Sequence, residues 1–192
     1  MASTLPELSL SDWAVLGVVA EGPTHGWPVV RALRGDGPIG RVWTVARPVV
    51  YRSLTTLQAQ GLIEECGEAP GVRGPQRTIM RATRRGRSAL RRWLATPVTH
   101  VRDVRSVFLV KLALLSRADG PAEGLTRELV ARQLETLAPV IRAVSEPAEG
   151  EGFDAVLADW RREQALAVER FLRTVTTPPG RRRSGHGSST AS

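Results

Sequence analysis

The chain of 192 residues is long enough for one or two domains, and a hydrophobic fraction of 42% is sufficient for buried cores. A single cysteine, Cys66, excludes a disulfide within the chain, and no apolar run approaches the ~18 residues that span a bilayer. The first residues lack the charged and apolar regions of a signal peptide, so we expect a soluble cytoplasmic protein.

The net charge of +8 is unevenly distributed. Residues 1–100 hold 13 basic and 7 acidic residues, whereas residues 101–177 hold 11 basic and 12 acidic residues. Three further arginines, Arg181–Arg183, follow. A basic half beside a nearly neutral half indicates an anion-binding module joined to a part with another task. A solvated basic surface without a partner is the simpler alternative.

Helical periodicity predicts three helices near the start of the chain, over residues 9–20, 25–33 and 46–60. Ser9 and Asp12 have the spacing of a capping box. Thr24 can cap the second helix, and Pro48 is tolerated in the first turn of the third.

A short hairpin and a fourth helix are predicted next. Residues 63–66 have the pattern of a strand, and the alternation over 77–83 predicts an antiparallel return across a turn-rich tip. Thr83 can then cap a helix over 84–94. Three helices followed by a hairpin are the plan of a winged helix-turn-helix, in which the third helix enters a DNA groove.

The chain beyond Pro97 is predicted to be helical. Residues 103–115 are apolar almost all round, which indicates a helix buried on several sides. A segment over 122–145 contains Pro139, where we expect a kink or a break. Apolar residues over 153–175 step by four and three, as in a coiled-coil seam.

The expected fold is therefore mainly α with a small β-hairpin. Residues 1–96 are expected to form a winged helix-turn-helix DNA-binding domain, and residues 100–176 a helical dimerisation region that could also bind an effector. Residues 177–192 have the composition of a disordered basic tail.

Four stretches of the chain resemble the PadR-like family of winged helix-turn-helix transcriptional regulators. They are LGVVAEGPTHGWPVVRAL (16–33), VVYRSLTTLQAQGLIEE (49–65), RTIMRATRRGRSALRRWL (77–94) and FLVKLALL (108–115). The resemblance implies a homodimeric repressor whose C-terminal helices form the dimerisation arm, and release of DNA when a small hydrophobic or aromatic effector binds. The chain departs from the family at Trp27, Pro28, Ala46 and Met80.

The third helix and the hairpin supply the candidate DNA contacts. Arginine can read guanine edges and valine suits a thymine methyl, whereas tyrosine and serine hydroxyls more often bind phosphates. Basic residues near the hairpin tip can follow the backbone or enter the minor groove. The candidates are Arg47, Val49, Tyr51, Arg52, Ser53, Thr55 and Thr56 on the helix, and Arg73, Gln76 and Arg77 on the hairpin. An ordinary exposed face is the alternative, and Tyr51 could instead be packed inside.

A dimer interface is predicted on the C-terminal helices, because their apolar seam needs covering. Its candidate residues are Phe108, Phe153, Leu157, Trp160, Ala167 and Phe171. Trp160 could line an effector pocket there, although packing is the simpler explanation. Trp13, Trp27, Trp43 and Trp93 are expected to build the core of the winged domain.

No catalytic or metal-binding pattern is found in the sequence. The three histidines are far apart, and Cys66 has no second cysteine with which to hold a structural zinc ion. We therefore expect neither an enzyme nor a cofactor. The expected partner is double-stranded DNA, with an inverted-repeat operator because a two-fold dimer presents its third helix twice. The alternative is a winged-helix adaptor that binds another protein, and the basic third helix argues against it.

Overall fold

The computed structural model describes residues 5–71, 74–117, 122–145 and 151–176. Its helices are α1 (Leu10–Ala20), α2 (Gly26–Leu33), α3 (Arg47–Ala59), α4 (Arg84–Ala95), α5 (Leu109–Leu115), α6 (Ala122–Ser145) and α7 (Gly152–Thr176). A 3₁₀ turn, η1 (Val101–Asp103), and a π-helical turn, η2 (Val104–Phe108), precede α5. Strands β1 (Ile63–Gly71) and β2 (Gly74–Ala82) form an antiparallel hairpin. The predicted fold class is confirmed.

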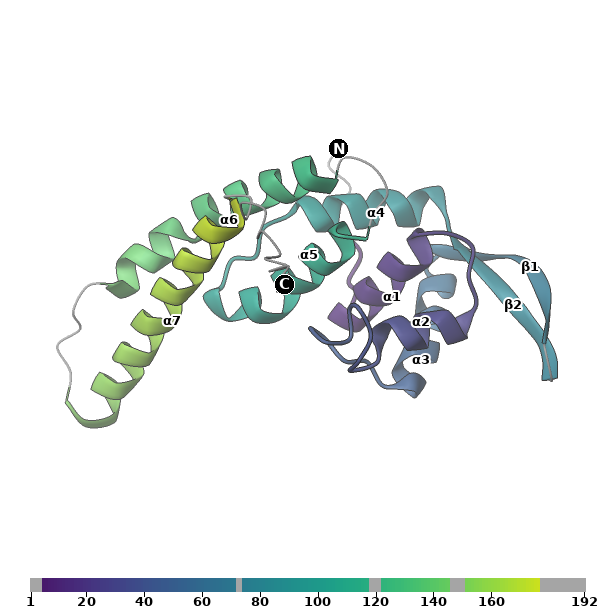
Figure 1. Ribbon diagram of the computed structural model, residues 1–192, viewed down its shortest axis with the longest axis horizontal. Helices are drawn as coiled ribbons and strands as arrows, with labels where there is room; N and C mark the ends of the chain where they lie inside the picture. Colours follow the sequence, from purple (N-terminus) through teal and green to yellow (C-terminus); the bar gives the residue numbers. More distant parts are fainter. Residues whose placement is uncertain (1–4, 72–73, 118–121, 146–150, 177–192) are drawn as a thin grey trace, which may run out of the picture.

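The molecule is elongated, and different elements make up its two ends. Figure 1 shows α1–α4 and the hairpin at one end, α6 and α7 at the other, and α5 between them. In the described part of the chain, no helix is both long and apolar enough to cross a membrane.

The first two helices begin in different ways. The predicted capping box of α1 is confirmed, because the Ser9 hydroxyl accepts from the N–H of Asp12 at 3.2 Å and the Asp12 carboxylate accepts from the N–H of Ser9 at 3.0 Å. The predicted Thr24 cap of α2 is wrong, since His25 is the N-cap residue and makes no side-chain cap bond. Thr24 instead exchanges two backbone hydrogen bonds with Met80 of β2, at 2.9 and 2.7 Å. Met80 also pairs with Glu65 of β1, so Thr24 adds a single paired residue at the other edge of β2.

The hairpin is longer than its predicted strands. Pairing begins at Ile63 opposite Ala82 and continues to Gly71 opposite Gly74, with register shifts on the way. One shift lies between Ala69 and Gly71, so Pro70 falls at an irregularity where its missing N–H does not interrupt the ladder. Pairing between the strands thus extends them through a segment whose local composition predicted only a loop.

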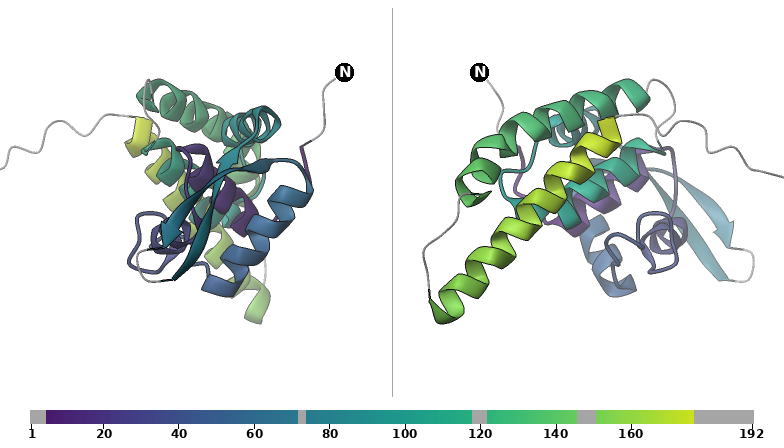
Figure 2. Two further views of the ribbon diagram at one scale, coloured as in Figure 1. Left: turned by 90° about the vertical axis from the view of Figure 1, so that its right-hand side faces the viewer. Right: turned by 60° about the vertical axis from the view of Figure 1, so that its left-hand side comes forward.

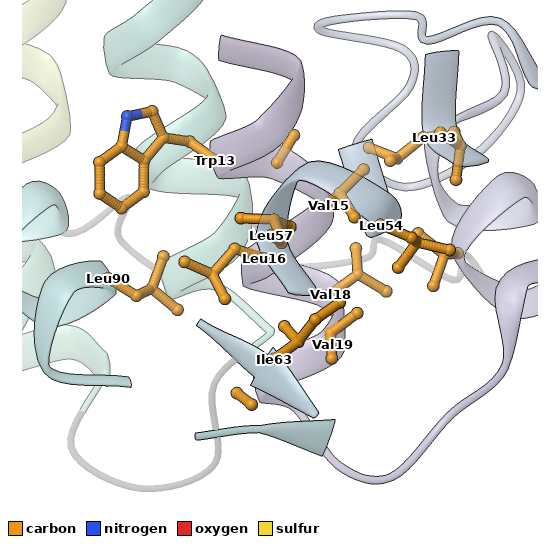
Figure 3. Packing of buried hydrophobic residues seen from close by; sticks show 14 of the residues in the cluster. Trp13, Val15, Leu16, Val18, Val19, Leu33, Leu54, Leu57, Ile63 and Leu90 are labelled. Atoms are coloured by element: carbon orange, nitrogen blue, oxygen red, sulfur yellow. The ribbon is translucent and has the colours of Figure 1, made fainter. Parts of the chain in front are cut away.

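The core of the winged end is shared by α1–α4 and the hairpin. Figure 3 shows Leu16 of α1, Leu57 of α3 and Ile63 of β1 packed together, and all three are fully buried. Trp13 and Trp93 stack with ring centroids 5.0 Å apart, as expected of core residues. The same expectation is wrong for Trp27 and Trp43, which are exposed.

Helix α5 contributes to two cores, which explains its lack of a polar face. Val110 and Leu114 pack into the winged core, whereas Leu115, together with Phe108 at the end of η2, packs into a second core with α6 and α7. Gly17 of α1 allows a close approach, because a Cβ built there would lie 2.5 Å from the Leu114 side chain. The predicted single helix over 103–115 is replaced by η1, η2 and α5 in succession.

The second core joins α6 and α7 to the segment that precedes α5. Gln133 of α6 is buried and pairs with both backbone groups of Val98, accepting from its N–H and donating to its carbonyl at 2.8 Å each. Leu137 and Ile141 of α6 and Leu172 of α7 are buried in this core. Helix α6 is not broken at Pro139.

Candidate nucleic-acid interface

Helix α3 has one buried face and one exposed face. Val50, Ser53, Leu54 and Leu57 are buried against the core. At 3.6 residues per turn the opposite side carries an exposed ridge, which we define as Pro48, Arg52, Thr55 and Ala59. Arg52 is the charged side chain of this ridge and lies midway along the helix.

The two faces divide the predicted contacts on α3. Ser53 is only 1% exposed and is withdrawn from the DNA-binding set, because its hydroxyl lies inside the core. Its spacing of three and four residues from Val50 and Leu57 already placed it in the apolar stripe. Val49 and Thr56 are half-buried at one flank. Arg47 and Tyr51 are exposed at the other flank, which faces the hairpin.

A groove separates α3 from the hairpin, and the start of α2 closes it. Its volume is about 830 Å³. Predicted contacts that line it are Arg47, Tyr51, Thr55, Gln76 and Arg77, and residues that the sequence analysis missed are His25, Trp27 and Gln58. Arg52 does not line the groove. Figure 2 (left) shows α3 in blue and the hairpin in teal as the two elements that flank it.

Contacts inside the groove fix the position of Tyr51. A Cβ built on Gly26 would lie 2.7 Å from Cε1 of Tyr51, so the ring occupies space that only a glycine at position 26 leaves free. The Arg47 guanidinium carbon lies 5.7 Å from the Tyr51 ring centroid, a cation–π contact. Tyr51 is 44% exposed, so the alternative that it is packed inside is wrong.

The groove is electrostatically positive. Among the described residues, neither Arg47 nor Arg77 forms an ion pair with a carboxylate. Nη1 of Arg77 lies 3.5 Å from Nε2 of His25. The carboxylate of Glu65 accepts from Nε2 of Gln58 at 2.9 Å. The two arginines are therefore available to an anion.

Two groups of predicted basic residues cannot be placed. Arg73 near the hairpin tip and Arg181–Arg183 in the tail lie outside the described residues. Within the described part of the chain, no cluster of His, Cys, Asp or Glu side chains could hold a metal ion.

The predicted dimer residues of α7 lie largely on the surface of the single chain. Phe153 and Trp160 are 75% and 60% exposed, and Ala167 and Phe171 are also exposed, whereas Leu157 is half-buried. Phe108 is fully buried in the second core of its own chain and is withdrawn from the interface. The seam predicted from the sequence is thus largely exposed, and only partly covered by the described part of the chain.

A fold of three helices and a hairpin, with a basic helix beside a basic groove, defines a winged helix-turn-helix DNA-binding protein. Residues 15–92 match the sequence model of the Transcriptional regulator PadR-like family. The resemblance stated from the sequence is confirmed over those residues, and the match supports a transcriptional regulator that binds DNA. No curated protein matches the chain.

Several solved structures are similar to the chain at low identity. Bacillus subtilis PadR in complex with operator DNA is 17% identical, with 86% of this chain and 97% of that chain covered and a TM-score of 0.43. The same protein in complex with p-coumaric acid is 15% identical, with 88% and 97% covered and a TM-score of 0.42. Streptococcus mutans smu.1604c is 16% identical, with 85% and 96% covered and a TM-score of 0.40.

Proposed function

We propose that this chain is a sequence-specific repressor of transcription that binds an inverted-repeat operator as a homodimer. The observation that carries the proposal is the exposed ridge of α3 beside a groove with two arginines, Arg47 and Arg77, that form no ion pair with a carboxylate of the described residues. The ridge supplies an arginine and a threonine for base edges, and the groove supplies charge for phosphates.

The dimer is proposed from the surface of α7. Phe153, Val156 and Trp160 lie within two turns of the helix and are all exposed, which is a large apolar surface for a soluble chain. A second copy that packs against this surface would remove it from water. In this proposal residues 1–96 bind DNA and residues 100–176 mediate dimerisation, with α5 contributing to both cores. Residues 177–192 are a basic tail.

An effector that releases DNA is also part of the proposal. A small apolar cavity of about 260 Å³ lies where α4, α5 and α6 meet, and Leu94, Leu115, Leu125 and Leu129 line it. This volume is near the lower end for ligand pockets and suits one aromatic ring. The cavity lies between the DNA-binding end and the α6–α7 end, so a ligand there could change how they pack.

The test is selection of binding sites from random duplexes, followed by titration at several salt concentrations. We expect an enriched inverted repeat and an affinity that falls steeply with salt, because each neutralised phosphate releases counterions. An adaptor would enrich no sequence and would bind a partner protein instead. A salt-independent affinity without an enriched motif would refute the proposed function.

A further inference from the structure

Helix α4 carries a row of arginines on its exposed face. Four of them are exposed and form no ion pair with a carboxylate of the described residues, and we define them as the α4 ridge: Arg84, Arg85, Arg87 and Arg91. The Arg87 guanidinium donates a hydrogen bond to the carbonyl of Ala82 at the end of β2. At 1.5 Å per residue the ridge is about 10 Å long. Its positive charge is not balanced by the part of the chain that the structure describes.

The ridge faces away from the exposed side of α3. Trp93 of α4 stacks on Trp13 of α1. At 3.6 residues per turn, Arg84 and Arg91 lie on the side of α4 opposite to Trp93. Helix α1 packs against both α4 and α3, and Figure 1 shows it between the two. A duplex bound along α3 therefore lies on the other side of the winged end from the ridge.

The position of these arginines along α4 opposes the stability of the helix. Arg84 and Arg85 occupy the first turn, which contains no acidic residue. A helix N-terminus repels cations, because its free N–H groups carry partial positive charge. Arg84, Arg87 and Arg91 are also three and four residues apart, a spacing at which like charges repel. The fold gains nothing from this arrangement, since α4 is held to the core from its other side, and a local cost of this kind is typical of a functional surface.

The ridge suits a phosphate polymer better than a protein partner. Protein interfaces depend on buried aromatic or aliphatic anchors, and between these arginines the exposed face of α4 offers only the half-buried Ser88. Arg85 and Arg87 diverge to the two flanks of the helix, with the other two arginines between them. A helix about 10–12 Å wide fits a major groove ~12 Å wide, whose two edges are lined by phosphates. Diverging arginines on such a helix can contact both edges without reading bases.

We propose that the α4 ridge is a second, sequence-independent site for duplex DNA, on the side of the winged end opposite to α3. The protein then binds two duplexes at once, the operator through α3 and the hairpin, and any second duplex through α4. The inference goes beyond the proposed function and rests on it only for the identity of the first duplex. Its consequence is that the bound regulator joins separate DNA segments.

The test is capture of a second duplex. An immobilised operator duplex is saturated with the full chain and washed, and a fluorescent duplex of scrambled sequence is then added at ~50 mM salt. We expect the wild-type protein to capture it, with a slope of log affinity against log salt of about −3 to −4, since each neutralised phosphate contributes ~0.9. Arg84→Gln/Arg85→Gln/Arg91→Gln should weaken capture by roughly tenfold or more and reduce the slope to about −1. Its operator affinity should stay within about twofold of the wild type, because the ridge does not contact the operator.

Two controls accompany this variant. Arg105→Gln/Arg127→Gln/Arg142→Gln removes the same charge from exposed positions of η2 and α6, and should capture the second duplex as the wild type does. Urea unfolding checks the fold of the ridge variant. It should be at least as stable as the wild type, because the substitutions remove repelling cations from α4. A loss of capture then reports the ridge and not a loss of structure.

The outcomes separate this inference from the proposed function. Unchanged capture by the ridge variant, or equal losses in the two triple variants, would overturn the ridge assignment and leave an operator-binding regulator. A parallel loss of operator affinity would make α4 part of the operator site and would also overturn it. Tighter binding of poly-L-glutamate than of a duplex of equal charge would overturn it in favour of an acidic protein partner. If the wild type selects no operator, the proposed function fails, while ridge-dependent binding of a scrambled duplex would still support the inference.

Discussion

Lys111 is the one lysine of the chain, and it is buried where α5 meets the end of α4. Its ammonium lies 4.8 Å from the Trp93 ring centroid and donates a hydrogen bond to the carbonyl of Thr96. Burial lowers the pKa of Lys111 from 10.5 to about 8. We expect this single group to make the stability of the protein depend on pH in the alkaline range.

The sign follows from proton binding in the two states. Between pH 8 and 10.5 the lysine is protonated in the unfolded chain and largely neutral in the folded one. The unfolded state then binds more protons, so the free energy of unfolding rises with pH across this window and falls again as the pH returns to 8. The pKa difference corresponds to a total change of about 3 kcal/mol, with a slope of at most ~1.4 kcal/mol per pH unit.

The perturbation is Lys111→Met, which keeps an unbranched apolar chain and removes the titration. Urea unfolding followed by tryptophan fluorescence, at one protein concentration and at pH 7.5, 8.5 and 9.5, gives both stability curves. The wild-type curve should rise relative to the variant by 1–2 kcal/mol over this range, as an order of magnitude. Arg105→Met on the exposed side of η2 is the control and should follow the wild type.

The difference in slope is the decisive quantity. At neutral pH the variant is stabilised because it does not bury a charge. It also loses the cation–π contact with Trp93, worth about 0.5–2 kcal/mol. The Thr96 carbonyl is left without its donor, at a cost of about 1–3 kcal/mol. These contributions oppose each other, and they become independent of pH only well below the folded-state pKa of about 8. Parallel wild-type and variant curves would show that Lys111 keeps its ordinary pKa and would refute the reasoning.

Three further predictions concern the proposed interfaces. Trp160→Asp should convert the proposed dimer into a folded monomer, because Trp160 is exposed on the single chain and a carboxylate would be buried in the contact. Light scattering that shows an unchanged dimer would contradict this prediction. Arg52→Ala should cost about 1–3 kcal/mol on the selected operator and far less on a scrambled duplex, since it removes a base contact. Equal losses in the two titrations would make Arg52 a phosphate contact. Gly26→Ala should lower DNA affinity about tenfold, because the new Cβ displaces the Tyr51 ring. The free energy of unfolding should change by no more than about 1 kcal/mol. Unchanged DNA affinity would show that the position of Tyr51 is unimportant for binding.

The winged fold could be predicted from local signals. The Ser9 cap, the breaks between helices and the alternation over 77–83 lie within a few residues of the features they determine. The strand lengths could not be predicted in the same way. They depend on pairing between β1 and β2 along the whole hairpin. The bridge from Thr24 to Met80 was equally hidden, because the two residues are 56 positions apart in the chain.

The candidate site was only partly predictable. The sequence identified α3 and the hairpin, but it gave no measure of the groove between them, because that space depends on where α2 begins. Residue type was misleading for Trp27, since tryptophan was assigned to the core by composition. Helical periodicity could have shown that Trp27 is exposed, because it lies on the side of α2 opposite to Val29 and Leu33. The same signal placed Ser53 inside.

Helix α5 links the two proposed interfaces mechanically. Val110 and Leu114 fix it to the winged core, and Leu115 fixes it to the core of α6 and α7. Arg117 just after α5 donates two hydrogen bonds to the Glu21 carboxylate at the end of α1, at 2.6 and 2.5 Å.

A half-site spacing of one helical turn, ~34–36 Å, requires the two copies of α3 in a dimer to be held at a fixed separation. Because α5 belongs to both cores, the position of α7 in the proposed dimer would determine that separation. A ligand in the cavity beside Leu115 would act on this same element, so that release of DNA would require only a small shift of α5 and no unfolding of the winged end.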